Sequence, residues 1–335
     1  MSTNPPSADL DPALVHDVTQ RLRGELGKSI AGQQEVIDTL MLSLFCHGHC
    51  LLVGVPGLAK TLLVRSLAQT LGLQFSRIQF TPDLMPGDIL GSEILHERSG
   101  GIEFDFQLGP IFTNLLLADE INRTPPKTQS ALLEAMQEHH VTVARETRAL
   151  PDPFLVVATQ NPIEHEGTYP LPEAQLDRFM FSINVGYPGK EVEVEIVRRT
   201  TAGEQPKPQS VVTREELLAV GEIVRAVPIA DHVLRYAVDL AEATRAGEPG
   251  ASQAARDYIE WGAGPRASQY LVLGAKALAL MSGKSAPETE QVRQVAPYVL
   301  AHRIVPNYRA TGEGHKPLDL VRMVVGQTPE PNYQA

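Results

Sequence analysis

The stretch CLLVGVPGLAKT, residues 50–61, joins a short apolar run to a glycine-containing loop and the first residues of a helical pattern. The run CLLV is typical of a buried strand, and the KTLLVRSLAQTLG that follows has the apolar spacing of a helix. A strand, a glycine loop and a helix in this order open an α/β unit. The stretch therefore predicts an α/β fold with a strand at residues 50–53.

Other short apolar runs fit the same fold. Further strands are predicted at 75–80, 114–119 and 154–159, and helices at 11–28, 33–46 and 127–140. Apolar runs that do not alternate and that are separated by helices indicate a parallel sheet covered on both faces. The segment 89–107 interrupts this rhythm and predicts a hairpin that turns at Ser99, Gly100 and Gly101.

The character of the chain changes at about residue 187. The stretch TTAGEQPKPQS (200–210) is rich in Pro, Gly and polar residues, as linkers are. Beyond it we find only helical periodicity, so the second half is expected to be all-α. The predicted organisation is an N-terminal helical extension (1–28), an α/β domain (29–187), a linker (188–209) and a helical domain (210–335).

Composition excludes some classes of function. The 335 residues are 43% hydrophobic and 21% charged, as in ordinary globular proteins, and the net charge is -11. Such an acidic chain is not expected to bind nucleic acid or anionic membranes by bulk charge. There is no apolar run long enough for a membrane span and no secretory pattern at the start, so a cytoplasmic location is expected.

The loop GVPGLAKT (54–61) has the features of a phosphate-binding loop. Its small residues let backbone N–H groups surround phosphates at the positive end of a helix. Lys60 is expected to reach the β- and γ-phosphates, and the Thr61 hydroxyl is expected to bind Mg²⁺. The usual pattern has glycine directly before the lysine, whereas Ala59 stands there in this sequence.

Three polar groups are expected to join this loop from other strands. Asp119 and Glu120 follow the strand LLLAD, and the ends of parallel strands meet at one edge of the sheet. Asp119 is therefore predicted to hold Mg²⁺, and Glu120 to orient and deprotonate the attacking water. Asn161, after VVATQ, would bring an amide to the same edge, where it could sense the γ-phosphate.

Arg178, in PEAQLDRF, lies near the end of the α/β half. It is too far along the chain to be assumed to face its own nucleotide, but an arginine here could reach the γ-phosphate of a neighbouring subunit. From the residues alone, a capping or salt-bridge arginine is the better-supported alternative.

The segment CHGHC (46–50) contains four candidate metal ligands. They are Cys46, His47, His49 and Cys50. Zinc sites use two such pairs that are distant in sequence, and this chain has no second cysteine pair. Buried free cysteines are common, and the glycine between the histidines can end the preceding helix. We therefore favour a structural role over a metal or redox role.

Read together, these motifs resemble the MoxR family of AAA+ ATPases. The stretches that carry the resemblance are GVPGLAKT, LLLADEINRTPPKTQSALLEAMQE, VVATQNPIEHEGTYPLPEAQLDRF and GPRASQYL. They occur in the family's order over about residues 30–330. The resemblance implies a P-loop α/β domain with a hairpin inserted in its second helix, followed by a helical lid. It also implies assembly into a ring, expected to be a hexamer.

The resemblance assigns a role to each matching residue. Lys60 and Thr61 match Walker A, Asp119 and Glu120 match Walker B, and Asn161 matches sensor 1. Arg178 matches the arginine finger and Arg266, in GPRA, matches sensor 2, where Gly264 replaces the usual serine. Arg123 falls at a subunit-facing position, and the segment IAGQ (30–33) resembles the one that packs on adenine. The expected ATP-binding residues are Gly32, Gln33, Gly54, Val55, Pro56, Gly57, Leu58, Ala59, Lys60, Thr61, Leu62, Asp119 and Arg266.

The function implied is that of an ATP-hydrolysing chaperone that remodels, activates or inserts a cofactor into a partner complex. The resemblance also suggests a partner with a von Willebrand factor A domain. Two alternatives stay open: a chelatase-type motor subunit, and a nucleotide-gated switch that hydrolyses little. A nucleic-acid motor is disfavoured by the acidic charge.

Overall fold

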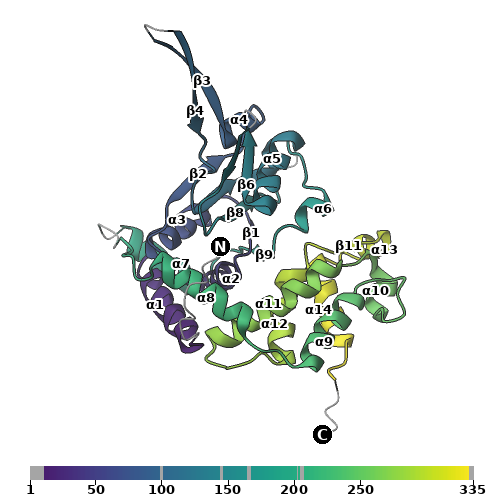
Figure 1. Cartoon of the computed structure of the whole chain (residues 1–335). Helices are drawn as coiled ribbons and strands as arrows, with labels where there is room; N and C mark the ends of the chain where they lie inside the picture. The colour runs from purple at the N-terminus through teal and green to yellow at the C-terminus, as the bar shows by residue number, and fades with distance from the viewer. Residues whose placement is uncertain are drawn as a thin grey trace, which may run out of the picture. The chain divides into compact units, whose positions relative to one another are not determined.

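The computed structural model describes residues 11–98, 101–143, 146–163, 167–201, 203 and 207–331. The chain divides into two compact units. One consists of Gly24–Val211, and the other consists of the residues before Gly24 together with those from Val212 onward. Figure 1 shows the elements of both.

A five-stranded sheet organises the Gly24–Val211 unit. Its strand order is β2-β5-β8-β1-β9, and every neighbouring pair is parallel. The strands are β1 (Cys50–Val53), β2 (Phe75–Gln79), β5 (Leu115–Asp119), β8 (Leu155–Gln160) and β9 (Phe181–Asn184). The register pairs Gln79 with Asp119 and Val53 with Gln160, so these strands end at one edge of the sheet. The predicted parallel α/β core is confirmed.

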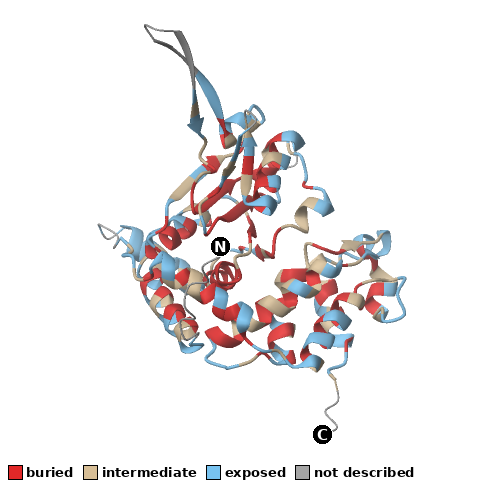
Figure 2. Cartoon of the chain, viewed as in Figure 1, coloured by how far each residue is buried: buried red, intermediate tan, exposed pale blue. Residues whose placement is uncertain are grey.

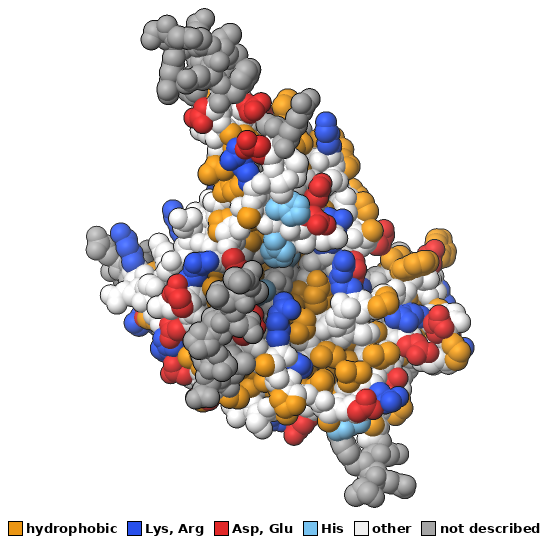
Figure 3. All heavy atoms as spheres, viewed as in Figure 1, with side chains coloured by type: hydrophobic (Ala, Val, Ile, Leu, Met, Phe, Trp, Pro, Cys, Tyr) orange, Lys and Arg blue, Asp and Glu red, His pale blue; other side chains and the backbone are white. Residues whose placement is uncertain are grey.

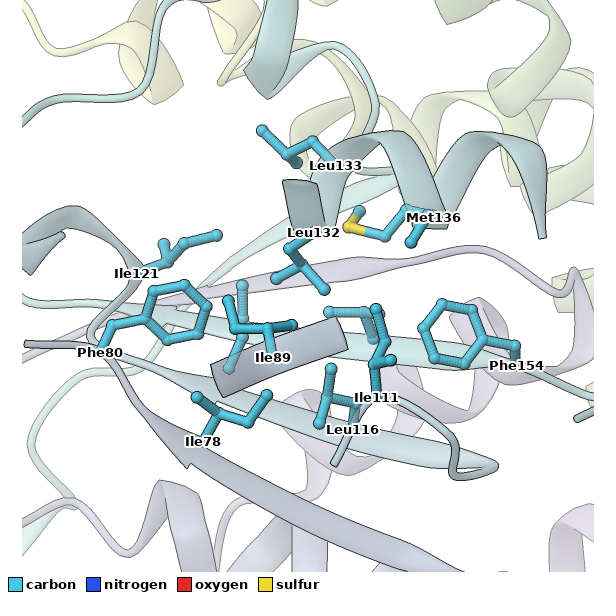
Figure 4. Close-up of a cluster of buried hydrophobic side chains, with 14 of the residues drawn as sticks. Ile78, Phe80, Ile89, Ile111, Leu116, Ile121, Leu132, Leu133, Met136 and Phe154 are labelled. Atoms are coloured by element: carbon cyan, nitrogen blue, oxygen red, sulfur yellow. The ribbon is translucent and has the colours of Figure 1, made fainter. Parts of the chain in front are cut away.

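The central strands are buried on both faces. All five residues of β5 are buried, as are the first five residues of β8 (Figure 2). Alternate residues of the two strands, among them Leu116 and Val156, join a cluster that includes Leu132 and Met136 of α5 (Figure 4). Burial of this kind contributes about 1.5–3 kcal/mol per large apolar side chain. It explains why these runs contain no polar alternation.

Helices surround the sheet in this unit. They are α2 (Gln34–Phe45), α3 (Lys60–Thr70), α4 (Pro86–Leu90), α5 (Pro126–Glu138), α6 (Glu173–Leu176) and α7 (Lys190–Thr201), with a short 3-10 turn η1 at Ile121–Arg123. Helix α7 lies inside the range 188–209 that was expected to be a linker. Its Val192 side chain packs against Gly32, which shows that this part of the range is folded structure.

Two antiparallel hairpins leave the sheet. One is formed by β3 (Gly91–Arg98) and β4 (Gly101–Leu108), as predicted, and extends away from the five-stranded sheet (Figure 1). Ser99 and Gly100 of its expected turn lie outside the described residues. At its root, a Cβ added to Gly91 would lie 2.3 Å from the Gln107 carbonyl oxygen, and one added to Gly109 would lie 2.4 Å from the Gly91 nitrogen. The two backbone segments can approach this closely only because both residues are glycine.

The second hairpin was not predicted. Strands β6 (His140–Val143) and β7 (Glu146–Ala149) follow α5, whose last turn ends at His139 in the left-handed conformation. The Arg148 guanidinium lies 4.4 Å from the centre of the Phe106 ring, so a cation–π contact joins this hairpin to the first one.

The second unit is helical, as predicted, with one small addition. Its helices are α8 (Arg214–Ala226), α9 (Asp231–Glu242), α10 (Gln253–Tyr258), α11 (Pro265–Met281), α12 (Thr289–Leu300), α13 (Tyr308–Gly312) and α14 (Pro317–Gln327). A short antiparallel pair, β10 (Ile259–Trp261) and β11 (Val305–Pro306), was not expected.

The N-terminal helix α1 (Ala13–Ser29) differs from the separate extension that the sequence suggested. Its residues up to Arg23 belong to the helical unit, where Arg21 bonds Glu216 at 2.7 Å and His16 lies 2.9 Å from the Met281 carbonyl oxygen. The physical reason is the apolar stripe of the helix, which includes the fully buried Val18 and Leu22 and must be covered.

Within the described part of the chain, no helix combines the length and apolar character that crossing a bilayer requires.

Candidate nucleotide site

A loop between β1 and α3 forms the floor of the candidate site. Gly54 donates its N–H to the Gln160 carbonyl at 3.1 Å, which fixes the start of the loop beside β8. Gly57 has φ +86°, and Ala59, the residue before α3, has φ +55° and ψ +22°. The left-handed turn at Ala59 aims the first N–H groups of α3 into the loop. Ala59, which stands where the usual motif has glycine, therefore adopts a conformation that favours glycine.

Lys60 and Thr61 begin α3 and face this loop. The Lys60 ammonium group donates a hydrogen bond to the Gly54 carbonyl, which folds the side chain back over the loop. The Thr61 hydroxyl lies 3.4 Å from Oδ2 of Asp119. The two residues predicted to hold Mg²⁺ are thus adjacent in the structure.

The acidic pair lies at the end of β5. Asp119 is 8% exposed, and its Oδ1 accepts a hydrogen bond from the Thr159 hydroxyl at 2.6 Å. The same hydroxyl accepts the Glu120 N–H at 2.8 Å. Glu120 has φ +58° and ψ +50°, an uncommon conformation for a residue with a side chain. Thr159 therefore holds both residues of the pair in place.

Two arginines neutralise these carboxylates. The Arg77 guanidinium donates from Nε (3.0 Å) and Nη2 (2.7 Å) to Oδ2 of Asp119. Glu120 accepts at Oε2 from Arg123 (3.0 Å) and from the Gln79 amide (2.7 Å). Sequence reasoning did not find Arg77, Gln79 or Thr159. The signal for the first two was their i, i+2 spacing in FSRIQF, but using it requires knowing that β2 lies beside β5.

The phosphate loop and the acidic pair line one cavity of about 440 Å³. Its lining residues are Pro56, Gly57, Leu58, Ala59, Lys60, Thr61, Leu62, Asp119, Glu120 and Asn161. Asn161 is 4% exposed, and its Oδ1 accepts the Ile163 N–H at 3.2 Å. Three segments far apart in sequence thus bring cationic, acidic and amide groups into one volume.

A smaller hollow of about 110 Å³ adjoins this cavity and shares Ala59 and Leu62 with it. Its remaining lining residues are Ser29, Ile30, Ala31, Gln33, Ile196, Arg199 and Thr200. Gln33 donates from its amide to the Leu58 carbonyl at 3.2 Å, and this bond ties the segment 30–33 to the phosphate loop. The contribution of α7 was missed because its residues were assigned to a linker.

The remaining predicted residues lie outside these linings. Val55 lies between β1 and the cavity residues of the loop, and Gly32 lines a neighbouring surface hollow with Val192. Arg178 follows α6, with its N–H on the Gln175 carbonyl at 3.2 Å. Arg266 is the second residue of α11 and belongs to the other unit. The roles predicted for Arg178 and Arg266 remain predictions.

The donor set fits a magnesium nucleotide. Gly54 leaves no room for a side chain, since a Cβ there would lie 2.6 Å from the Val185 carbonyl oxygen, while an added Cβ at Gly57 meets nothing within 4 Å. The loop thus packs on the protein side and is open at Gly57. A hydroxyl and a carboxylate 3.4 Å apart are oxygen ligands of the kind that Mg²⁺ takes alongside phosphate oxygens and water.

The CHGHC segment is largely packed within the protein. Both cysteines are buried, and burial raises the pKa of the Cys50 thiol. His49 accepts the Val156 N–H at Nδ1 (3.1 Å) and donates from Nε2 to the Met136 carbonyl (3.0 Å). The described residues contain no cluster of three or more potential metal-binding side chains.

The turn after α2 differs from the expectation that its glycine ends the helix. His47, with φ +52°, takes the left-handed position, and Gly48 donates its N–H to the Ser43 carbonyl at 2.8 Å. Gly48 is needed because a Cβ there would lie 2.5 Å from the sulfur of Met180.

The sheet, loop and lid together define a P-loop protein of the AAA+ class. The family model of the ATPase family associated with various cellular activities matches residues 49–181, and that of the AAA lid domain matches residues 251–321.

Individual relatives narrow the class. The chain is 44% identical to "Chaperone MoxR1" of Mycobacterium tuberculosis, over 96% of this chain and 85% of that protein. It is 33% identical to "Protein MoxR" of Paracoccus denitrificans, over 82% and 85% of the two chains. A solved structure from Cytophaga hutchinsonii, described as a candidate ATPase, has a TM-score of 0.87 at 41% identity and covers 96% of this chain and 97% of its own. The chain belongs to the MoxR family of AAA+ ATPases.

Proposed function

We propose that this chain is a Mg²⁺-dependent ATPase that converts ATP and water to ADP and phosphate. The observation that carries the proposal is the single cavity of about 440 Å³ in which Lys60, Thr61, Asp119, Glu120 and Asn161 all have a face. Phosphoryl transfer depends mainly on positioning and charge stabilisation, which is what such a set of groups can provide.

Each residue has a distinct task. The backbone of the loop and the Lys60 ammonium group bind the phosphates, while Thr61 and Asp119 would hold the metal ion. Mg²⁺, when bound, supplies positive charge that offsets the charge of the β- and γ-phosphates. Glu120 orients and deprotonates the water, and Asn161 holds it near the γ-phosphate. Thr159 keeps both residues in position: its hydroxyl donates to the Asp119 carboxylate at 2.6 Å and accepts the backbone N–H of Glu120 at 2.8 Å.

Assembly would complete the site. Arg178 lies outside the cavity lining, which is consistent with a role toward the nucleotide of a neighbouring subunit in a ring, taken to be a hexamer. Arg266 on the lid would respond to the γ-phosphate and couple nucleotide state to lid movement. Hydrolysis would then depend on subunit contact.

The biological task proposed is chaperone-like remodelling in the cytoplasm. One relative bears the description "Chaperone MoxR1" and aligns over nearly the whole of this chain. The proposed partner carries a von Willebrand factor A domain, and the proposed client is a protein complex that is activated or loaded with a cofactor.

A nucleic-acid motor fits less well. The chain carries a net charge of -11, and on the face shown in Figure 3 acidic and basic side chains are interspersed. No basic stripe is visible there that could follow a phosphate backbone. A chelatase-type motor subunit would use the same cavity and differ in its client.

Glu120→Gln tests the assignment directly. The variant keeps the size of the side chain but removes the base, so it should bind ATP with unchanged affinity and lose at least about 100-fold in turnover. Steady-state ATP hydrolysis measured against protein concentration adds the test of assembly, because shared sites give a specific activity that rises and then levels off. Equal turnover of wild type and variant would refute the assigned base. ATP binding without hydrolysis in both proteins would favour the nucleotide-gated switch.

A further inference from the structure

The Arg77 side chain covers the oxygen of Asp119 that faces Thr61. Both Nε and Nη2 donate to Oδ2, at 3.0 and 2.7 Å, and the same Oδ2 lies 3.4 Å from the Thr61 hydroxyl. The other oxygen, Oδ1, is used by Thr159 at 2.6 Å. Oδ2 is therefore the oxygen that a metal ion next to Thr61 would use. The Arg77 guanidinium already binds it.

The two partners differ in exposure. The Asp119 side chain is 11% exposed, whereas that of Arg77 is 45% exposed. A carboxylate so shielded from water is costly to leave without a positive charge. The guanidinium, in contrast, can be hydrated where it stands. Exchange of Arg77 for another cation would thus cost the arginine little and keep Asp119 neutralised.

The position of Arg77 permits this exchange. It lies on β2, the edge strand of the sheet, and its outward-facing side chain also contacts the Gln79 amide oxygen. The core does not enclose it, as it does the neighbouring Ile78, which is 5% exposed. Movement of the side chain away from Asp119 therefore disturbs no packed element.

We propose that Arg77 is an internal counter-ion that occupies the Mg²⁺-facing oxygen of Asp119 and must leave it when the magnesium nucleotide binds. The inference rests on the proposed function, since it takes the cavity as the site of the nucleotide. Arg77 protects the acidic site before loading and weakens its affinity for Mg²⁺.

A purely positioning role for Arg77 predicts the opposite change in Mg²⁺ affinity when the arginine is removed. If the guanidinium served to hold Asp119 in the orientation that the metal needs, its removal would weaken Mg²⁺ binding. The counter-ion role predicts that removal strengthens it, because the metal no longer competes with a built-in cation. The direction of the change therefore separates the two.

The test is the binding of AMP-PNP, a non-hydrolysable ATP analogue, measured by calorimetry at a series of free Mg²⁺ concentrations. Arg77→Gln should lower the Mg²⁺ concentration for half-saturation by about fivefold, the upper range for an exposed ion pair. Arg77→Lys keeps the charge but not the paired N–H geometry. Its Mg²⁺ concentration for half-saturation should lie between those of wild type and Arg77→Gln. Arg65→Gln, the same charge change at an exposed position of α3, is the matched control and should behave as wild type.

Each result decides the matter. An unchanged or higher Mg²⁺ requirement in both Arg77 variants overturns the counter-ion role, as does an equal shift in Arg65→Gln. Failure of wild type and all variants to bind AMP-PNP at any Mg²⁺ concentration would refute the nucleotide site itself, and the inference with it. The two failures are distinguishable because only the second abolishes binding in wild type.

Discussion

Acid should destabilise this protein through one buried histidine, His49. Its two ring nitrogens are both used: Nδ1 accepts from the Val156 N–H, and Nε2–H donates to the Met136 carbonyl. A second ring proton would have to sit on Nδ1, facing the Val156 N–H donor in a buried site. Burial above all, and secondarily the charge of His139, lowers the pKa of His49 from 6.5 to about 4, although the Met136 bond acts in the opposite direction.

The sign and size of the effect follow from this pKa. In the unfolded chain the histidine takes up its proton near pH 6.5, whereas in the folded chain it does so only near pH 4. The stabilisation is therefore complete above about pH 6.5 and is lost as the pH falls toward 4. At about 1.4 kcal/mol per pH unit, the full loss is about 3 kcal/mol, of which about 2 kcal/mol is lost by pH 5.

Urea unfolding of wild type and His49→Gln at pH 7.5 and pH 5 measures this effect. Other titrating groups cancel in the comparison, so wild type should lose about 2 kcal/mol more than the variant between the two pH values. The variant itself should be less stable at pH 7.5 because its amide replaces the two ring bonds imperfectly. His139→Gln, at an exposed histidine 6.3 Å away between ring centres, removes only a lesser cause of the lowered His49 pKa and leaves its burial unchanged, so this variant should keep most of the wild-type loss. Equal acid losses in wild type and His49→Gln would refute the reasoning.

Three further outcomes are expected. Ala59→Gly should raise the free energy of unfolding by about 0.5–1 kcal/mol, since relief of the left-handed strain exceeds the added chain entropy; a destabilised variant in urea would contradict this. Gly32→Ala should lose more stability than Gly57→Ala, because only at Gly32 would the new Cβ meet another side chain, that of Val192 at 2.2 Å. Equal urea midpoints of the two variants would show that the backbone strain at positive φ, which both positions share, determines the loss. Arg178→Ala and Glu120→Gln should each be inactive but regain about a quarter of wild-type ATPase when mixed one to one, since that share of interfaces has an intact residue from each partner; no recovery after subunit exchange would argue against a shared site.

The parallel sheet was accessible from the sequence because its central strands are uninterrupted apolar runs. LLLAD and FLVVAT contain no polar alternation, and the structure buries them on both faces. Helix α7 was missed for the opposite reason. Its sequence KEVEVEIVRRTT has no buried residue and lies next to a Pro- and Gly-rich stretch, so the composition indicated a linker. The β6–β7 hairpin begins directly after a left-handed His139, and the short strands HVTV and ETRA carry too weak a pattern to predict it.

Motif spacing predicted the site residues that follow a strand or begin a helix, but not the residue that reaches the site from an adjacent strand. Lys60, Thr61, Asp119 and Asn161 each follow a strand or begin a helix, and motif spacing is enough to bring them to one edge. Arg77 reaches the same site from the side of a neighbouring strand, and this requires the strand order β2-β5-β8. Contacts between adjacent strands depend on tertiary register, which short-range sequence patterns do not encode.

The glycine neck at the root of the β3–β4 hairpin makes this ribbon a modular attachment. Gly91 and Gly109 hold the two chains closer than side chains permit, so the path of the backbone is set before the ribbon begins. Beyond the neck the two strands pair with each other, and the contact of Phe106 with Arg148 joins this ribbon to the β6–β7 hairpin. Lengthening or shortening both strands in pairs of residues would change the reach of the ribbon and leave the nucleotide cavity as it is. The hairpin root thus fixes the path of the backbone, while the length and the side chains of the ribbon can vary.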